Sequence, residues 1–598
     1  MKRNKPLALV AGAALLTLAA CGGGSSDEGE TGEGTTREFG DQEGGTKDAE
    51  RQGPAEEIEG ATAGGTITVY LPGDPGPDSL DPTGGWSVTG NSIQQALTSR
   101  SLTQYVRDDE GQPVLVPDLA TDLGTPNDDY TEWTFTIRDD ATWEDGKPVT
   151  AEEVAFGICR SLDSEAFPSG PGTEYSKHYF AGAEDYEGPY TAKDPKCEAW
   201  DGVTVDGQDI TIKMSVPFPD MDYWGAFMAM GPSPLGNASK PPNYGTQPLS
   251  TGPYRVESYK PNEELVLVKN DQWVAESDPG RHQYADEFIF KFNQDQAKVD
   301  EIMLSDNADS QTAVSTALGS GNYNDANSQL GERLVQQTSQ CVSTLTPDYT
   351  KITDINVRKA LAYAYPYEDV WIAGGEVPGV TRTYANSVMP PGMAGKKEFE
   401  VDGEQIKYDP EKAKALLEEA GVEMPYPITY SYQQSETQDK VAAVLQQGWE
   451  EAGFKVTLDP LADTYYDVIN QPDKEADVMW AGWGADWPSA MTVLPPLFDS
   501  RQNFATDANG NVTNLGQDYG YYQSKEFEDL IDQAATAPDI ETQNEVLTQA
   551  DTVLANDVAY IPLDTTSFYW LYGSGITDFM TDAASSAYPD LGPIGVTQ

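Results

Sequence analysis

Apolar and polar residues alternate over short stretches in the first part of the chain, which is typical of half-buried β-strands. Residues 133–138 (WTFTIR) show this alternation, and residues 65–71 (GTITVYL) form a second expected strand before a turn-rich stretch. Thr150 and Glu153 stand three residues apart at the start of an apolar run. Their spacing predicts a capping box at the beginning of a helix.

Later in the chain, stretches with helical spacing of apolar residues alternate with short apolar runs. Residues 408–422 predict a helix, with Asp409 as N-cap, Pro410 at the first helical position and Gly421 as terminator. The neighbouring expected elements are a helix at 440–453, a short helix at 464–471, and strands at 427–432, 454–458 and 476–483. This β-α-β-α-β order favours an α/β fold with a mostly parallel sheet and helices on its faces.

One aspartate, Asp486, follows the last of these strands in the sequence AGWGADWPSA (481–490). In open α/β sheets, ligands bind in the crevice beyond the C-terminal ends of the strands. One interpretation is a tight turn near Pro488, with tryptophans that cover the core. The other is that Asp486, between Trp483 and Trp487, receives a cationic group from a ligand.

The composition limits the class of protein. A chain of 598 residues, 38% hydrophobic and 10% aromatic, can bury several cores, and we expect two or three lobes. Its 98 acidic and 37 basic residues give a net charge of −61, which argues against nucleic-acid binding. This charge fits either a solvated surface in salty surroundings or attraction of cationic ligands. His178 and His282 stand far apart, so we expect no histidine-built metal site and no cofactor.

Residues 1–20 are typical of an export signal, because a basic start precedes an apolar run of about 14 residues, too short to span a bilayer. The small residues before Cys21 resemble a bacterial lipobox. This resemblance implies cleavage before Cys21, lipidation of its sulfur and anchoring at the outer face of the bacterial cell membrane. An ordinary signal peptide is the alternative. Residues 21–63 are rich in Gly, Ser, Thr and acids, and are expected to form a disordered tether.

Three cysteines follow in the mature chain. A disulfide between Cys159 and Cys197 is compatible with a protein outside the cell, because both fall in one stretch of sequence. Closing a loop of about 40 residues would stabilise the fold by about 4 kcal/mol in the chain-entropy model. The state of Cys341 is left open.

Several distinctive stretches are spread over almost the whole mature chain: SLDP (79–82), LVPDLATDL (115–123), WTFTIRDDATWEDGKPVTAEEVAF (133–156), STGPYRVESY (250–259), LVLVKNDQW (266–273), DINVRKALAYA (354–364), YDPEKAKALLEEAG (408–421) and AGWGADWP (481–488). Together they resemble the extracytoplasmic solute-binding proteins of family 5, which serve peptide, dipeptide and nickel ABC importers. Each stretch alone is weakly specific, whereas their order and spacing together are specific. The resemblance implies a periplasmic-binding-protein-like fold of two α/β lobes, joined by a two-segment hinge, that closes on a ligand.

The family fold also implies an arrangement of domains along the chain. Lobe I is expected at about 64–111, 246–345 and 566–598, its extra subdomain at about 112–245, and lobe II at about 346–565. A monomer is expected, which docks on the permease subunits of an ABC importer.

In the peptide binders of this family, an aspartate in a GW-x-x-D-type segment holds the α-ammonium group of the ligand. The resemblance assigns this role to Asp486, beside Trp483 and Trp487. Tryptophans lower the local dielectric constant, which strengthens an ammonium–carboxylate pair. The other expected contacts are the main chain of Gly482, Trp483 and Gly484, which would bind the peptide as an added strand, and Ser87, Val88 and Thr251 of the first lobe.

The chain departs from its relatives in two places. Pro488 stands where an acid–proline pair is frequent, and residues 433–435 lack the arginine that dipeptide specialists provide for the ligand carboxylate. The length of the ligand therefore stays open, with Arg382 as another candidate partner of the carboxylate. Oligopeptides are the favoured ligands.

Two other binding functions are compatible with the same fold. The main alternative to peptide binding is binding of an oligosaccharide or a chelated metal. A receptor that signals without transport would use the same pocket. A glycosidase-like enzyme is disfavoured, because the sequence has no GxSxG, HExxH or P-loop motif.

Overall fold

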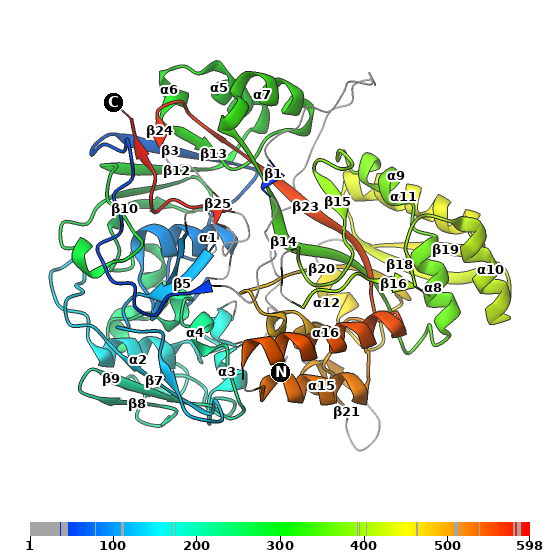
Figure 1. The fold of residues 1–598 in the computed structure, drawn as a ribbon, viewed down its shortest axis with the longest axis horizontal. Coiled ribbons are helices and arrows are strands. Elements are labelled where there is room, and N and C mark those ends of the chain that lie inside the picture. Colours follow the sequence, from blue (N-terminus) through cyan, green and yellow to red (C-terminus); the bar gives the residue numbers. More distant parts are fainter. Residues whose placement is uncertain are drawn as a thin grey trace, which may run out of the picture. The chain divides into compact units, whose positions relative to one another are not determined.

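The computed structural model describes residues 36–37 and 46–597, apart from residues 78, 86, 109–112, 169, 174, 392, 394, 402, 462–464, 507–511, 515, 538, 578–580 and 583–587. The described chain divides into two compact units. Unit 1 comprises residues 46–335 and 569–597, and unit 2 comprises residues 36–37 and 336–568. The chain passes from one unit to the other within β14 (Leu334–Pro347) and again within β23 (Ile561–Tyr572) (Figure 1).

The lobe boundaries expected from the sequence, at 345/346 and 565/566, fall within these same two strands. The division into two lobes and a subdomain remains a prediction.

Unit 1 contains part of a large mixed sheet. Its strands in spatial order are β10 (Tyr254–Lys260), β11 (Glu264–Lys269), β12 (Glu287–Gln294), β3 (Thr66–Pro72) and β13 (Ala313–Ser315). The first three strands pair antiparallel, and β3 pairs in parallel with β12 and β13. Ile67, Val69 and Leu71 of β3 are fully buried, which confirms the strand expected at 65–71. Helix α5 (Gln296–Ser305) packs on β3 and β13.

A smaller antiparallel sheet lies elsewhere in unit 1, near α2 (Ala151–Arg160) (Figure 1). Its strands in spatial order are β6 (Thr125–Pro126), β7 (Glu132–Thr136), β9 (Asp209–Lys213) and β8 (Val203–Asp206). Trp133 and Phe135 of β7 are buried between more exposed neighbours, as their alternation predicts. The capping box at α2 is also confirmed: Glu153 N–H donates to Thr150 Oγ1 at 3.2 Å, and Thr150 N–H donates to Glu153 Oε2 at 3.1 Å.

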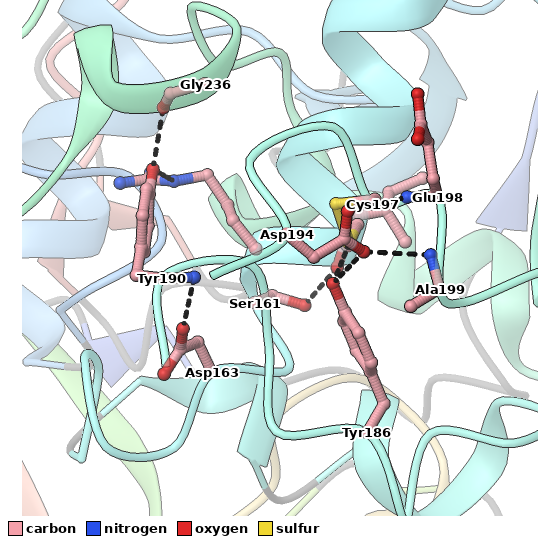
Figure 2. Close-up of a disulfide and its surroundings, with 12 residues drawn as sticks. Ser161, Asp163, Tyr186, Tyr190, Asp194, Cys197, Glu198, Ala199 and Gly236 are labelled. Carbon is pink, nitrogen blue, oxygen red and sulfur yellow. Dashed lines mark hydrogen bonds between the residues drawn. A yellow bond between two sulfur atoms is a disulfide. The ribbon is translucent and has the colours of Figure 1, made fainter. Parts of the chain in front are cut away.

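A disulfide joins Cys159, in the last turn of α2, to Cys197 in the following irregular region (Figure 2). Asp194 holds the loop around Cys197. Its carboxylate accepts hydrogen bonds from two main-chain N–H groups just beyond Cys197, at 3.0 and 2.9 Å, and from the Tyr186 hydroxyl at 3.0 Å. The disulfide that the sequence allowed is therefore present, in a segment of otherwise little regular structure.

Part of the segment that the sequence assigns to a disordered tether is ordered. Strand β2 (Thr46–Lys47) pairs in parallel with β5 (Pro113–Pro117), and the ammonium of Lys47 lies 2.6 Å from the carboxylate of Asp222. Residues 46–63 are thus part of unit 1, and their assignment to a disordered tether is wrong. The physical reason is that even a polar segment becomes ordered when a sheet edge and an acidic surface offer partners for its main chain and its few basic groups.

The signal segment 1–20 and Cys21 lie outside the described residues. Within the part that the structure describes, no helix has both the length and the apolar character needed to cross a bilayer.

Unit 2 has the β-α-β-α-β order that the sequence predicts. Strands β18 (Tyr426–Gln433) and β19 (Phe454–Leu461) pair in parallel along their whole length. Strand β20 (Val478–Gly484) pairs in parallel with β18 and antiparallel with β14, so the sheet is mixed. Further elements of unit 2 are α8 (Ile355–Tyr363), α9 (Tyr367–Ala373), β15 (Arg382–Tyr384), α10 (Pro410–Ala420), α11 (Glu436–Glu451), α12 (Tyr465–Ile469), α15 (Lys525–Ala535) and α16 (Ile540–Asp557).

Local sequence explains the ends of helix α10. The Asp409 side chain accepts a hydrogen bond from Lys412 N–H at 2.9 Å, Pro410 occupies the first turn, and Gly421 ends the helix with a φ of 67°. The buried face of α10 carries Ala413 and Leu417, which belong to the core of unit 2. This helix therefore begins and ends where its capping residues predict.

Candidate functional site

Strand β20 carries the candidate main-chain contacts and is only partly enclosed by its neighbours. On one side it pairs with β14 over all seven residues, from Val478 to Gly484. On the other side, among the described residues, it pairs with β18 only at Val478 and Met479. The following carbonyl, that of Trp480, accepts a hydrogen bond from the Tyr465 hydroxyl at 2.7 Å. From Ala481 onward, this edge of β20 carries no strand partner within the described chain.

Gly484 faces Cys341 across the β14–β20 pair. A Cβ atom added at Gly484 would lie 2.9 Å from Cys341 Sγ, too close for a van der Waals contact. Glycine at this position therefore allows the strand to pass beside the half-buried thiol.

The loop after β20 turns back on itself through Thr492. The indole N–H of Trp483 donates to the carbonyl oxygen of Thr492 at 2.7 Å, and the main-chain N–H of Asp486 donates to Thr492 Oγ1 at 3.3 Å. Thr492 is fully buried, and its hydroxyl in turn donates to the Ser489 carbonyl at 3.0 Å. Asp486 thus stands two residues beyond the strand, on a loop that is fixed by hydrogen bonds.

The two tryptophans beside Asp486 differ in their surroundings. Trp487 is 1% exposed and belongs to the core, whereas Trp483 is half-buried. Asp486 is itself half-buried. Its charge still acts on a neighbour: burial raises the pKa of the Cys341 thiol, and the negative charge of Asp486 raises it further.

Ser87 and Val88 mark the beginning of helix α1 (Val88–Ile93) in unit 1. Ser87 is the N-cap, and its hydroxyl oxygen accepts a hydrogen bond from Gly90 N–H at 3.1 Å. Both residues are half-buried, so part of each faces solvent. They belong to unit 1, whereas Asp486 belongs to unit 2.

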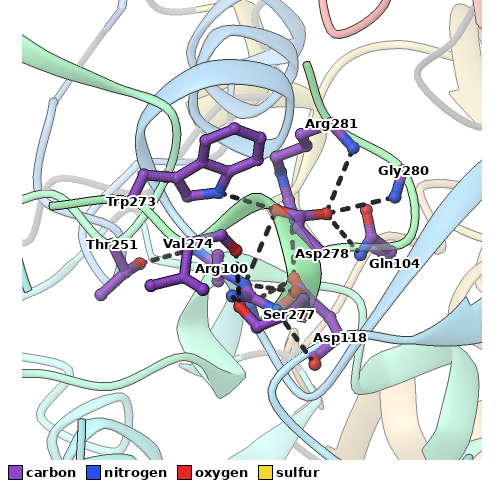
Figure 3. A network of polar contacts seen from close by, with 12 residues as sticks. Arg100, Gln104, Asp118, Thr251, Trp273, Val274, Ser277, Asp278, Gly280 and Arg281 are labelled. Carbon is purple, nitrogen blue, oxygen red and sulfur yellow. Dashed lines mark hydrogen bonds and ion pairs between the residues drawn. The ribbon is translucent and has the colours of Figure 1, made fainter. Parts of the chain in front are cut away.

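Thr251 does not fit the role of a ligand contact. It is 3% exposed, and its hydroxyl oxygen accepts a hydrogen bond from the main-chain N–H of Arg100 at 2.9 Å (Figure 3). We correct the expectation for this residue, because a side chain that is buried and engaged within unit 1 offers nothing to a ligand. The TGPY stretch that suggested it has a structural role.

The interactions beside Thr251 form a buried ion-pair network (Figure 3). The guanidinium groups of Arg100 and Arg281 contact the carboxylates of Asp118 and Asp278 at 2.6–3.8 Å, with all four side chains at most 4% exposed. Burial alone would raise the pKa of Asp278, but the charges of Arg281 and Arg100 outweigh it and hold the pKa below its ordinary value. Such a matched network fixes the loops of unit 1 and leaves no charge for a ligand.

Arg382, the other candidate for a ligand carboxylate, is already paired within unit 2. Its guanidinium lies 3.0 Å from Glu376 Oε1 and 3.4 Å from Asp564 Oδ1, and it also donates to the Thr566 hydroxyl. These two carboxylates raise the pKa of Arg382 against the opposing effect of burial. The arginine is therefore neutralised by the chain itself.

Among the described residues, no group of three or more His, Cys, Asp or Glu side chains is placed so that it could hold a metal ion.

The comparisons with known proteins agree with this architecture. The family model described as bacterial extracellular solute-binding proteins, family 5 Middle, matches residues 114–505, more than half of the chain. The chain belongs to this family. This family 5 solute-binding protein is 24% identical over 542 residues to the oligopeptide-binding protein OppA of Bacillus subtilis, covering 84% of the chain and 88% of the relative. It is 26% identical over 496 residues to the periplasmic oligopeptide-binding protein OppA of Salmonella typhimurium, covering 79% and 83% of the two chains.

Solved structures share its fold. The clavulanic acid biosynthesis oligopeptide binding protein 2 has a TM-score of 0.77 at 22% identity, covering 93% of this family 5 protein and 100% of the other chain. OppA of Haemophilus influenzae, solved with the peptide RPPGFSPFR, has a TM-score of 0.63 at 20% identity and covers 89% and 99% of the two chains. The α/β fold of a periplasmic binding protein, expected from the sequence, is confirmed.

Sequence reasoning missed two residues that shape the candidate site. Cys341 reaches Gly484 and Asp486 only because β14 pairs with β20, and Thr492 holds the loop through a hydroxyl in a segment without a motif. No local signal in the sequence of β14 gives its partner strand.

Proposed function

We propose that this family 5 protein is the substrate-binding lipoprotein of an ABC importer, and that it captures peptides, with oligopeptides as the favoured ligands, and delivers them to the permease. The observation that carries the proposal is the loop after β20, where a half-buried Asp486 follows a strand whose outer edge lacks a strand partner from Ala481 onward among the described residues. Binding, without chemical conversion of the ligand, is the proposed activity.

The main chain of β20 supplies the general part of recognition. An extended peptide can add to an exposed sheet edge through hydrogen bonds that every peptide backbone offers. Residues Gly482, Trp483 and Gly484 present this edge, and the glycines keep it free of bulky side chains. Ser87 and Val88 at the start of α1 are proposed to contact the other edge of the same peptide. Affinity would then depend little on the side chains of the ligand.

Asp486 supplies the charged part of recognition. Asp486 follows the end of this edge. A peptide that pairs with the edge as an added strand would present its N-terminal ammonium group there. The half-buried surroundings, with Trp487 in the core beneath, weaken screening by water and strengthen the pair. The net charge of −61 favours the approach of a cationic terminus over long range.

We further propose that lipidation at Cys21 anchors the mature protein to the outer face of the cell membrane. The basic start, the apolar run and the small residues before Cys21 support this. The protein is proposed to act as a monomer.

Mass spectrometry of ligands that remain bound through purification tests this proposal. Denaturation of the protein releases the bound small molecules, which are then identified. We expect peptides of several lengths with free amino termini. Oligosaccharides or metal chelates in molar amounts, with no peptide, would contradict the proposed ligand class while leaving the family assignment intact.

A further inference from the structure

Unit 1 contains a cavity of about 320 Å³ that none of the candidate peptide contacts lines. One wall is the N-terminal segment 51–58, and another is the helix formed by α1 and its π-helical continuation Gln94–Thr98. The rest of the lining comes from β4 (Thr103–Arg107) and its flanking residues, Ala226 and Met228, residues 279–282 and the C-terminal segment 589–593. Its volume lies within the range of small-molecule sites, about 300–1,000 Å³. The cavity is thus large enough for a ligand of modest size.

Among the polar atoms of the lining side chains, Ser92 Oγ and His282 Nδ1 have no hydrogen-bond partner in the described chain. The Ser92 side chain is 3% exposed. The other ring nitrogen, His282 Nε2, lies 2.7 Å from the carbonyl oxygen of Glu56, so Nε2 carries the hydrogen and Nδ1 is a bare acceptor. Both atoms are withdrawn from bulk water. Buried polar atoms left without partners are costly, and a bound polar molecule removes that cost.

One arginine of the described lining, Arg51, differs from the other two in having no ion pair with a described residue. Arg107 lies 2.8 Å from Asp590, and Arg281 is neutralised in the network of Asp118 and Asp278. Arg51 is half-buried at the cavity and makes no ion pair with any described residue. The remaining acids of the lining are Asp108 and Glu56, and the side chain of Glu56 is exposed to solvent.

Apolar groups complete the lining. Ile58, Ala96, Val106 and Met228 contribute hydrocarbon surface beside the polar atoms. A ligand that suits this environment has a compact apolar part, an anionic group for Arg51, and a hydrogen-bond donor for His282 Nδ1.

We propose that this cavity binds a small carboxylic acid that carries a hydroxyl or amino group on the adjacent carbon. The carboxylate pairs with Arg51 and accepts a hydrogen bond from Ser92 after rotation of its hydroxyl, and the adjacent O–H or N–H donates to His282 Nδ1. The site is separate from the peptide contacts and does not rest on the proposed function.

Calorimetry with three matched probes tests the site on the full mature chain. The probes are 2-hydroxyisocaproate, the same acid without its hydroxyl (4-methylpentanoate), and the amide of the hydroxy acid. We expect the hydroxy acid to bind and the other two to bind about tenfold more weakly or worse, because 4-methylpentanoate lacks the donor for His282 Nδ1 and the amide lacks the negative charge for Arg51.

Variants locate the binding. Arg51→Gln is expected to weaken the binding of the hydroxy acid about tenfold or more. Ser92→Ala should weaken this binding severalfold without lowering the melting temperature, since the removed hydroxyl has no hydrogen-bond partner in the described chain. Arg333→Gln is the matched control, because Arg333 of unit 1 pairs with Asp306 away from the cavity. Asp486→Asn should leave this affinity unchanged.

Several outcomes would overturn the proposal. These are no binding of the hydroxy acid at millimolar concentration, equal affinity in Arg51→Gln and the parent protein, loss of binding in Asp486→Asn, or a crystal soaked with the hydroxy acid that shows only water in the cavity. Failure here would leave peptide binding at β20 untouched.

Discussion

Asp486 owes its position to a few specific contacts of its loop. Thr492 holds both the indole of Trp483 and the main-chain N–H of Asp486, so the carboxylate cannot drift far from the end of β20. On the other side, Cys341 of β14 is close enough for the charge of Asp486 to raise the pKa of its thiol. A ligand ammonium at this place would meet a carboxylate that is already oriented, which lowers the entropy lost on binding.

The first prediction is that Asp486→Asn lowers the affinity for peptides with a free amino terminus about thirtyfold or more. Asparagine keeps the shape of the side chain and removes the charge that pairs with the ammonium group. Isothermal titration calorimetry measures the affinity, and the melting temperature should stay nearly constant, because Asp486 is half-buried and its main-chain bond to Thr492 remains. Asp369→Asn, an exposed position of α9, is the control. Unchanged affinity would remove Asp486 from the site.

Residues that define local structure were predictable, whereas those that act through distant partners were not. The capping box at Thr150 and the ends of α10 follow from neighbours a few positions away, and both are confirmed. Thr251 was misjudged because its motif says nothing about its burial against Arg100. The cavity at Arg51 was invisible in the sequence, since its walls come from six segments of the chain.

At the scale of elements, the β14–β20 pair is the part of unit 2 that supports the candidate strand edge. The two strands run antiparallel, and Gly484 lies against the thiol of Cys341. The sequence predicted the order of β18, α11, β19 and β20, because helical and strand periodicities alternate there. It predicted a mostly parallel sheet and missed the antiparallel partner, because β14 is distant in sequence and register with a distant strand leaves no local pattern.

The second prediction concerns this strand pair. Gly484→Ala should lower the free energy of unfolding by about 1–3 kcal/mol and weaken peptide binding, because the added methyl group collides with Cys341 Sγ. Cys341→Ala in the same chain should restore most of both losses by removing the sulfur. Denaturant unfolding and calorimetry on the two single variants and the double variant give the coupling. Additive losses in the double variant would show that the close approach is not the cause.

At the scale of the whole molecule, two units are joined by two strands, and each unit contains charges buried away from water. In unit 2, the ammonium of Lys474 lies 2.8 Å from the carboxylate of Asp348, with both side chains fully buried. Asp518 lies nearby and accepts hydrogen bonds from the main-chain N–H groups of Gly520 and Tyr522. Burial raises the pKa of Asp518 to about 7, against the lowering effect of these bonds and of Lys474.

The third prediction follows from this raised pKa. The folded state holds the proton of Asp518 more tightly than the unfolded chain, so the stability that this group contributes is complete below its ordinary pKa, near 4, and is lost as the pH rises to about 7. Asp518→Asn cannot ionise, and its unfolding free energy should fall less over this window than that of the parent protein. Chemical denaturation at a series of pH values measures the difference. Parallel curves for the parent protein, Asp518→Asn and the control Asp369→Asn would contradict the assignment.

The proposed function of the whole molecule depends on one feature that every linear peptide shares, a free amino terminus. If Asp486 recognises this group and the edge of β20 recognises the backbone, affinity should depend strongly on the terminal charge and weakly on the sequence of the peptide. A tripeptide and its N-acetylated copy share the remaining backbone and side chains and differ in that charge.

Calorimetric titration of the full mature protein with such a pair is the most direct measurement of this claim. The account predicts that acetylation weakens binding about thirtyfold or more in the parent protein and makes little further difference in Asp486→Asn. Equal affinities of the parent protein for the free and the acetylated peptide would contradict it.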